Sequence, residues 1–387
     1  AGCEKLQMVD ASATNGLEVN AYSFKGCGAL TQVVFPENVS QVSTYPFQSC
    51  GKLQSVELHN VAGSIKQYAF IDCASMKNLS IGCIDGNIER DAFKNCSALE
   101  TIAVGEMKGN LNDYALNYCN NLKSVEFGKG PAVIGSCILE YSPNVNSFVA
   151  GEGTVEVKDY AFSTSSSYYN RYSKNLVTVV LPSTLKKIGA SAFEECSSLS
   201  NLIIPENVNS IGNKAFNSCS SLTEIVLPDS ITAIGNETFY ACAKMERVEF
   251  PKGLLTIGAS AFRECDALQM VKLPPTVTTL SDNAFNGCNA LTEVKLTNLS
   301  RPSDGAFSDC AKLEKVELEK EAKELGTRHR AGIGITETIN VTSIIVSEET
   351  GIISIAKGGK ITRYADSEAL RSVLKEYYWQ DILSGTK

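Results

Sequence analysis

The segment "KELGTRHRAGIGITE", residues 323–337, holds the side chains of this 387-residue chain that are best suited to phosphate chemistry. Thr327, Arg328, His329 and Arg330 bring two guanidinium groups within four residues. A guanidinium group matches phosphate oxygens with two parallel hydrogen bonds, and a nearby helix start adds backbone N–H donors. The segment therefore has three possible roles: a working phosphate site, a relic of one, or a cap on the repeats that precede it.

The cysteines are the other group of chemically reactive side chains, and fourteen are present. Twelve fall in one column of the repeat described below, where side chains point the same way, so we expect reduced, buried thiols that act as small hydrophobes. Cys83 and Cys137 lie off the column and are candidates for exposure. The chain has two histidines and no C-x-x-C or H-E-x-x-H motif, so we expect no metal site and no nucleophile–histidine pair in the repeats.

A repeat of 23 residues organises most of the chain. One turn is "CSSLSNLIIPENVNSIGNKAFNSC", from Cys196 to Cys219. Eight extra residues interrupt the repeat once, after Phe162, and the last step is 22 residues long. The repeated aromatic position is filled by Phe24, Phe47, Phe70, Phe93, Leu116, Leu139, Phe162, Phe193, Phe216, Phe239, Phe262, Phe285 and Phe307.

A period of this length with spaced leucines predicts a β-rich leucine-rich repeat solenoid, a right-handed superhelix of about fourteen coils. Each V-x-L is expected to be a short parallel strand that proline ends, because proline has no N–H for the ladder. His59 replaces that proline in its turn and is expected at a strand end. The phenylalanine rings should fill the core. We assign residues 1–318 to the solenoid and 319–387 to a small α+β segment.

These motifs resemble the BspA-like (Treponema pallidum-type) leucine-rich repeat family over about residues 1–318. The resemblance implies a bacterial cell-surface or secreted protein that binds a protein or glycan on a host or neighbouring cell. It does not identify the ligand. The chain begins inside a turn, at Cys3, so we expect more repeats or a cap upstream in the native gene.

The residues that flank the central valine of each strand should face the concave side of the solenoid. Its middle is apolar and its C-terminal third is charged. An exposed apolar stripe favours a partner surface, although β-branched residues also favour strands for backbone reasons. The insertion, residues 163–175, adds tyrosines beside the stripe. The predicted partner-binding residues are Val149, Val180, Ile203, Val226, Tyr168, Tyr169 and Tyr172.

The repeat stops at about residue 319. "EKEAKELGTRHR" has helical spacing up to Gly326, and "VTSIIVSEE" predicts a buried strand. "GIISIAKGGKITRYA" predicts a hairpin that turns at Gly358 and Gly359. "DSEALRSVLKEYYWQDIL" predicts a helix capped by Asp366 or Ser367. Together these elements form the α+β segment.

This tail resembles the C-terminal half of the diadenylate cyclase domain, which joins two ATP molecules into cyclic di-AMP, over residues 322–378. The other half of that domain, with its Asp-Gly-Ala metal motif, is replaced by repeats, and Asp304-Gly305-Ala306 belongs to the last turn. Without that metal-binding carboxylate, phosphoryl transfer lacks its main electrostatic stabilisation. We therefore expect no catalytic residue and a tail that caps the last coil. The resemblance implies nucleotide binding by Thr327, Arg328, His329, Arg330, Ser347, Glu348 and Glu349.

Two functions follow from these resemblances. The first is a non-catalytic cell-surface binding protein, which needs no cofactor and no metal. The alternative is a cytoplasmic nucleotide-binding or diadenylate cyclase-like protein that uses ATP with Mn²⁺ or Mg²⁺ and has the repeats as a scaffold. A purely structural rod is a third. The net charge of -8 argues against a nucleic-acid partner, and no apolar run reaches the roughly 20 residues of a membrane-spanning helix.

Overall fold

The computed structural model shows a parallel β-solenoid of about 13 turns, which confirms the predicted fold class. The residues that it describes contain no helix. The chain divides into two compact units: unit 1 comprises Ala1–Ile231 and Glu237–Met245, and unit 2 comprises Thr232–Asn236 and Glu246–Lys387. The described residues are 2–163, 174–297, 299, 303–319, 342–346, 353–357 and 360–364.

Parallel strands of unit 1 pair in three sheets. The first contains β1 (Met8–Asp10) and β3 (Gln32–Val34). The second has the order β12 (Thr178–Val180), β10 (Ser147–Val149), β8 (Ser124–Lys129), β7 (Thr101–Met107), β6 (Asn78–Ile84), β5 (Ser55–Val61), β4 (Asn38–Val42) and β2 (Leu17–Val19). The third has the order β14 (Ser210–Ile211), β13 (Lys187–Ile188), β11 (Glu156–Val157) and β9 (Val133–Ile134). Unit 1 also contains β15 (Glu224–Val226).

Unit 2 holds two parallel sheets and one antiparallel sheet. The parallel sheets are β16 (Ala233–Ile234), β18 (Thr256–Ile257) and β20 (Thr279–Leu280), and β19 (Met270–Lys272), β21 (Glu293–Thr297) and β22 (Lys315–Glu319). Unit 2 also contains β17 (Arg247–Glu249). The antiparallel sheet is β23 (Thr342–Val346), β24 (Ile353–Lys357) and β25 (Lys360–Tyr364).

The antiparallel sheet confirms the hairpin predicted in the tail. Lys357 pairs with Lys360, so β24 and β25 reverse direction across residues 358–359. The helices predicted before Gly326 and after Ser367 lie outside the described residues. The division at residue 318 stays a prediction.

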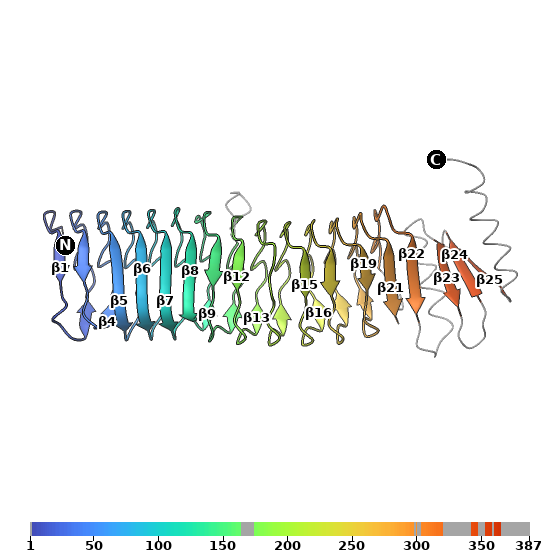
Figure 1. Cartoon of the computed structure of the whole chain (residues 1–387), viewed down its shortest axis with the longest axis horizontal. Helices are drawn as coiled ribbons and strands as arrows, with labels where there is room; N and C mark the ends of the chain where they lie inside the picture. Colours follow the sequence, from blue (N-terminus) through green and yellow to red (C-terminus); the bar gives the residue numbers. More distant parts are fainter. Residues whose placement is uncertain are drawn as a thin grey trace. The chain divides into compact units, whose positions relative to one another are not determined.

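Proline after the second apolar position of a strand ends the strand early. Pro36 and Pro182 end the three-residue strands β3 and β12, because proline gives no N–H to the ladder. In the seven-residue strands β5, β6 and β7, which lie side by side in Figure 1, this position is His59, Gly82 or Gly105. The prediction that His59 lies at a strand end is therefore wrong, since its N–H allows the strand to continue.

The phenylalanine column forms the core of each turn, as predicted. In unit 1, the rings of Phe47 and Phe70 stack with centroids 5.0 Å apart and planes 6° from parallel. In unit 2, the rings of Phe262 and Phe285 stack at 5.1 Å. All four side chains are fully buried. Because successive rings are stacked, each turn covers the ring of the one before it, and no turn completes its core alone.

Cysteine side chains are packed in the same core. None of the fourteen cysteines, all of which lie in the described residues, forms a disulfide, and the column members from Cys27 to Cys288 are buried, as expected. The Sγ of Cys73 donates to the carbonyl oxygen of Phe47 at 3.3 Å. The expectation that Cys137 is exposed is wrong: it is 1% exposed, and the column explains only part of thiol burial. Cys83 is half-buried.

Each turn bends at two residues with left-handed backbone, four positions apart. In one turn these are Tyr68 (φ 61°) and Asp72 (φ 62°), and most other turns also use non-glycine residues. A left-handed L-residue costs about 1 kcal/mol, so packing must offset this cost. Tyr45 and Tyr68, at one such position, stack with ring centroids 4.9 Å apart.

Candidate functional site

The most regular exposed surface of unit 1 is one side of strands β5, β6, β7, β8, β10 and β12, which we call the strand face. Two rows of side chains run across it, one on each side of the buried central residue of each strand. The hydroxyl row is Ser55, Asn78, Thr101, Ser124, Ser147 and Thr178. The outer row is Glu57, Ser80, Ala103, Glu126, Val149 and Val180.

Backbone pairing fixes both rows. Glu126 pairs with Val149 and Val149 with Val180, so the three side chains are consecutive neighbours on one side of the sheet. Adjacent strands lie about 4.8 Å apart, which sets the spacing along each row. The hydroxyl row carries no charge, and Thr101 Oγ1 donates to Asn78 Oδ1 at 2.9 Å.

The predicted aliphatic residues lie at or beyond the end of the outer row. Val180 is 48% exposed, Ile203 79% and Val226 50%. Val149 is half-buried. Ile203 lies outside any strand, so its place in a continuous stripe stays a prediction. The other predicted site residues lie outside the described part of the chain: Tyr168, Tyr169, Tyr172, Thr327, Arg328, His329, Arg330, Ser347, Glu348 and Glu349.

The sequence prediction missed Val177. Its side chain is 46% exposed, immediately before β12. The same position in the two preceding turns is polar, Lys123 and Asn146. An apolar residue at a position that is otherwise polar was the available signal. Val177 enlarges the exposed aliphatic surface at this end of the strand face.

Carboxylates are the only charged groups in the two rows. Among the described residues, no ion pair joins Glu57 or Glu126 to a cation. The row beside the hydroxyl row differs, since Lys123 Nζ contacts Glu100 Oε2 at 2.8 Å and this hydrogen bond lowers the pKa of Glu100. Lys77 lies in that row too and contributes less to the shift. The strand face therefore combines unpaired acidic side chains with an aliphatic end.

Charged groups on β21 and β22 of unit 2 pair with each other. Lys295 contacts Glu317 at 3.1 Å and Glu293 at 3.5 Å, and Lys315 contacts Glu293 at 3.2 Å. The hydrogen bond to Glu317 is the largest cause of the raised pKa of Lys295. Because these charges neutralise one another, the strand face of unit 1 is the better candidate site.

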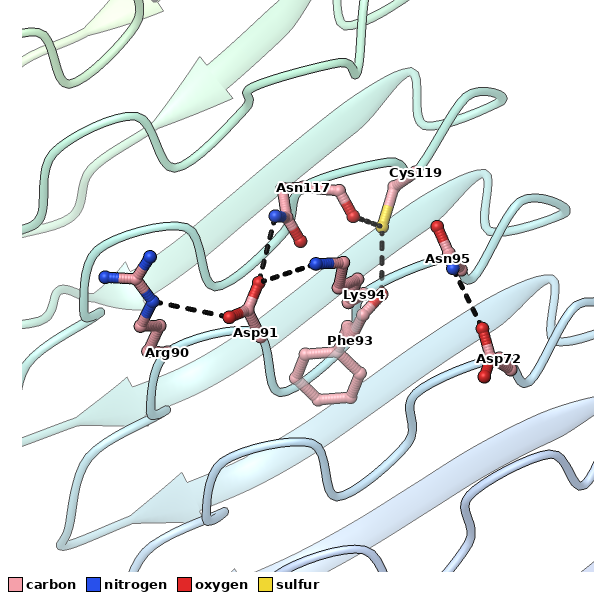
Figure 2. Close-up of polar contacts among 8 residues, drawn as sticks. All are labelled: Asp72, Arg90, Asp91, Phe93, Lys94, Asn95, Asn117 and Cys119. Atoms are coloured by element: carbon pink, nitrogen blue, oxygen red, sulfur yellow. Dashed lines mark hydrogen bonds and ion pairs between the residues drawn. The ribbon is translucent and has the colours of Figure 1, made fainter. Parts of the chain in front are cut away.

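A buried polar cluster lies at the left-handed bends of successive turns in unit 1, away from the strands. Asp91 is 4% exposed and lies between Arg90 and Lys94 (Figure 2). Its Oδ2 accepts from Arg90 Nε at 3.3 Å, its Oδ1 accepts from Asn117 Nδ2 at 2.9 Å, and Lys94 Nζ lies 3.8 Å from Oδ1. Beside it, Asn95 Nδ2 donates to a carboxylate oxygen of the neighbouring turn, at 2.8 Å.

The cations of this cluster also cover aromatic rings. The Arg90 guanidinium lies 4.3 Å from the ring centroid of Tyr114, and Lys94 Nζ lies 5.5 Å from that of Tyr118. Burial raises the pKa of nearby Glu140. The contacts of Asp91 are internal to the fold, so we interpret the cluster as structural. Within the described ranges, no group of three or more His, Cys, Asp or Glu side chains is placed to hold a metal ion.

The repeats match a known family. Residues 1–106, 64–169, 165–289 and 232–350 match the family described as "BspA type Leucine rich repeat region". The chain belongs to this family. A solved leucine-rich repeat protein from Bacteroides ovatus ATCC 8483 is similar in fold to this BspA-type chain, with a TM-score of 0.54, 20% identity, and coverage of 83% of this chain and 85% of that one.

A short part of this BspA-type protein is similar to cyclases. It is 54% identical over 54 residues to the cyclic di-AMP synthase of Bacillus subtilis (strain 168), and 53% identical over 53 residues to a diadenylate cyclase of Listeria monocytogenes serotype 1/2a (strain 10403S). Each match covers 14% of this chain, and the chain spans about a fifth of those relatives, 20% and 19%. A search of the described residues finds no helix with the length and apolar character needed to cross a membrane.

Proposed function

We propose that this BspA-type protein is a non-catalytic binding protein that holds a macromolecular partner, a protein or glycan, on the strand face of unit 1. One observation carries the proposal. The outer row ends in the aliphatic residues Val149 and Val180, and Val180 is 48% exposed beside Val177, which is 46% exposed. Exposed aliphatic groups that lie together are uncommon on a surface without a partner.

The rest of the strand face suits recognition. A row of hydroxyl and amide groups borders the aliphatic end and offers both donors and acceptors. Interfaces combine an apolar centre with a polar rim, and the two rows have that composition. The backbone beneath these side chains is held by strand pairing, so little backbone entropy is lost on binding.

We also propose that the protein acts at the cell surface or is secreted, on a host or neighbouring cell. Membership of the BspA-type family supports this location. The cyclase-like segment supports the opposite one, because ATP is a cytoplasmic substrate. The repeats account for most of the chain, so the surface location is preferred.

The test uses the full chain, immobilised and exposed to surface extracts of candidate host and bacterial cells. Val180→Glu, Ile203→Glu and Val226→Glu should each reduce retention of a specific protein or glycan at least tenfold. The matched control is Val155→Glu, because Val155 is an exposed valine, 37%, placed before β11 in a different sheet. Equal retention by all four variants would overturn the proposal.

The cyclase similarity favours a second candidate function, nucleotide binding by the tail. The predicted residues, Thr327 to Arg330 and Ser347 to Glu349, lie outside the described residues, so this candidate depends on sequence identity alone. Incubation with ATP and Mn²⁺ or Mg²⁺ tests it. Cyclic di-AMP that forms with the unmodified chain and is absent with Arg328→Ala would establish a cyclase, and ATP binding without turnover would indicate a sensor.

A further inference from the structure

We propose that the partner segment bound on the strand face is an extended protein segment that presents basic side chains followed by aliphatic ones. This inference rests on the proposed function and makes it more specific. It depends on the order of side chains in the outer row, in which two carboxylates precede the aliphatic end. It excludes acidic segments and neutral glycans as the preferred partner of this surface.

The charge of the outer row favours a basic partner. Glu57 and Glu126 are exposed and, among the described residues, have no ion-pair partner. The neighbouring positions of both rows are hydroxyl, amide or aliphatic, so no cation screens these two groups from a ligand. Glu224 in β15, on the same strand as Val226, is a third exposed carboxylate of unit 1. A partner that carries lysine or arginine is attracted to such a surface, and an acidic one is repelled.

Charged residues beside the two rows do not cancel the negative charge that Glu57 and Glu126 present. On one side, Lys123 is engaged with Glu100 at 2.8 Å. On the other side, Lys129 lies 3.7 Å from Glu106. Lys77 lies near Glu100 and outside both rows. The carboxylates of the outer row are therefore the charges that a ligand on this face meets directly.

The spacing of the two carboxylates fits an extended chain. Glu57, Ser80, Ala103 and Glu126 are in register on consecutive strands, so the two carboxylates lie roughly 14 Å apart. An extended chain rises about 3.4 Å per residue, and its side chains on one face recur every second residue. Basic residues four positions apart therefore reach both carboxylates.

The aliphatic end of the outer row can be reached by the same extended segment. Val149 and Val180 follow Glu126 by one and two strands, roughly 5 and 10 Å further along the row. Side chains two and four positions after the second basic residue share its face and lie about 7 and 14 Å further along, so they meet the aliphatic surface between Val149 and the end of the row just past Val180. The expected motif is a basic residue at positions 1 and 5 and an aliphatic residue at positions 7 and 9.

The experiment selects binders from a random 12-residue peptide library displayed on phage, with the full chain as target. Parallel selections use Glu57→Gln/Glu126→Gln, Val180→Ser, and the control Glu18→Gln, which removes an exposed carboxylate of β2. Peptides lost on Val180→Ser define the binders that depend on the strand face, because Val180 is the exposed aliphatic end of the outer row. We expect these peptides to be enriched at least threefold in Lys and Arg, at a four-residue spacing, on the unmodified chain and on Glu18→Gln.

The variants separate the preference for a basic segment from the proposed binding function. On Glu57→Gln/Glu126→Gln, the enrichment in basic residues should disappear while the enrichment in aliphatic residues remains. Face-dependent peptides without an excess of basic residues would overturn this inference and leave the proposed function standing. If no selected peptide depends on Val180, both the inference and the proposed function are wrong.

Discussion

The Sγ of Cys96 donates to the carbonyl oxygen of Phe70 at 3.2 Å, from one turn of the solenoid to the one before it. The same oxygen accepts from the backbone N–H of Cys73 at 3.2 Å. Ser142 occupies the cysteine column in its own turn, and its Oγ donates to the carbonyl oxygen of Leu116 at 2.8 Å. The column therefore requires a small side chain with a hydrogen-bond donor.

Cys96→Ala should lower the free energy of unfolding by about 1 kcal/mol, because one of two hydrogen bonds to the Phe70 carbonyl is lost. Cys96→Ser should retain more stability, since the hydroxyl can donate as Ser142 does. Urea titration followed by circular dichroism measures both. Cys83→Ala, at a half-buried position off the column, is the control. Equal stability of the alanine and serine variants would show that the hydrogen bond is unimportant.

Alkaline pH should destabilise the protein through its buried thiols. Burial raises the pKa of Cys50 and of Cys119 to about 12, whereas an unfolded cysteine titrates near 8.5. Between these values the unfolded state has lost protons that the folded state keeps, so stability falls as the pH rises from about 9 to 12. Urea midpoints at pH 8 and pH 10.5 test this, and Cys119→Ala should show a smaller decrease. A midpoint that rises with pH would contradict the prediction.

Asp91→Ala should cost about 2 kcal/mol of stability, because it leaves the buried amide of Asn117 without its acceptor and removes a buried charge from between two cations. Asp91→Asn should cost less, since asparagine tolerates the left-handed backbone there (φ 56°). Asp72→Ala is the control, because Asp72 is half-buried and accepts from Asn95. Thermal denaturation of the three variants ranks them. An equal effect of Asp91→Ala and Asp72→Ala would remove the special role of Asp91.

Gly105→Ala should destabilise unit 1 by about 1 to 3 kcal/mol through overpacking. A Cβ at this position would lie 2.5 Å from the carbonyl oxygen of Gly82, so the two strands would have to separate. At Gly51 a Cβ would have no atom within 4 Å, and Gly51→Ala should leave stability unchanged within about 0.5 kcal/mol. Chemical denaturation compares the two. Similar midpoints would show that β6 and β7 yield without strain.

The solenoid could be predicted because its period repeats the same packing problem in every turn. Phe47 and Phe70 fill equivalent positions, so the sequence alone implies that their rings stack. The left-handed bends at Tyr68 and Asp72 could not be predicted, because their residue types differ from turn to turn and the backbone conformation is imposed by packing. The extended strand through His59 could not be predicted from the position of proline, because a residue with an N–H permits a longer strand without requiring one.

The candidate site could be predicted in part. The alternation along each strand identified Val180 and Val226 as exposed, because residues on either side of a buried valine face outward. Val177 was missed, since alternation along a strand does not extend to the residue before it. The Asp91 cluster could not be predicted either, as its partners come from different turns and depend on side-chain directions at the bends.

The ladder of unit 1 crosses the longer step of the repeat without losing register. Val149 pairs with Val180, and Glu156 with Lys187, although each pair is 31 residues apart and not 23. The rings of Phe162 and Phe193 stack at 4.9 Å across the same step. Extra sequence after a core phenylalanine is thus tolerated without refolding its neighbours. This makes the corresponding loops natural places at which evolution can lengthen the chain, and at which an engineer can display foreign epitopes at intervals of one coil.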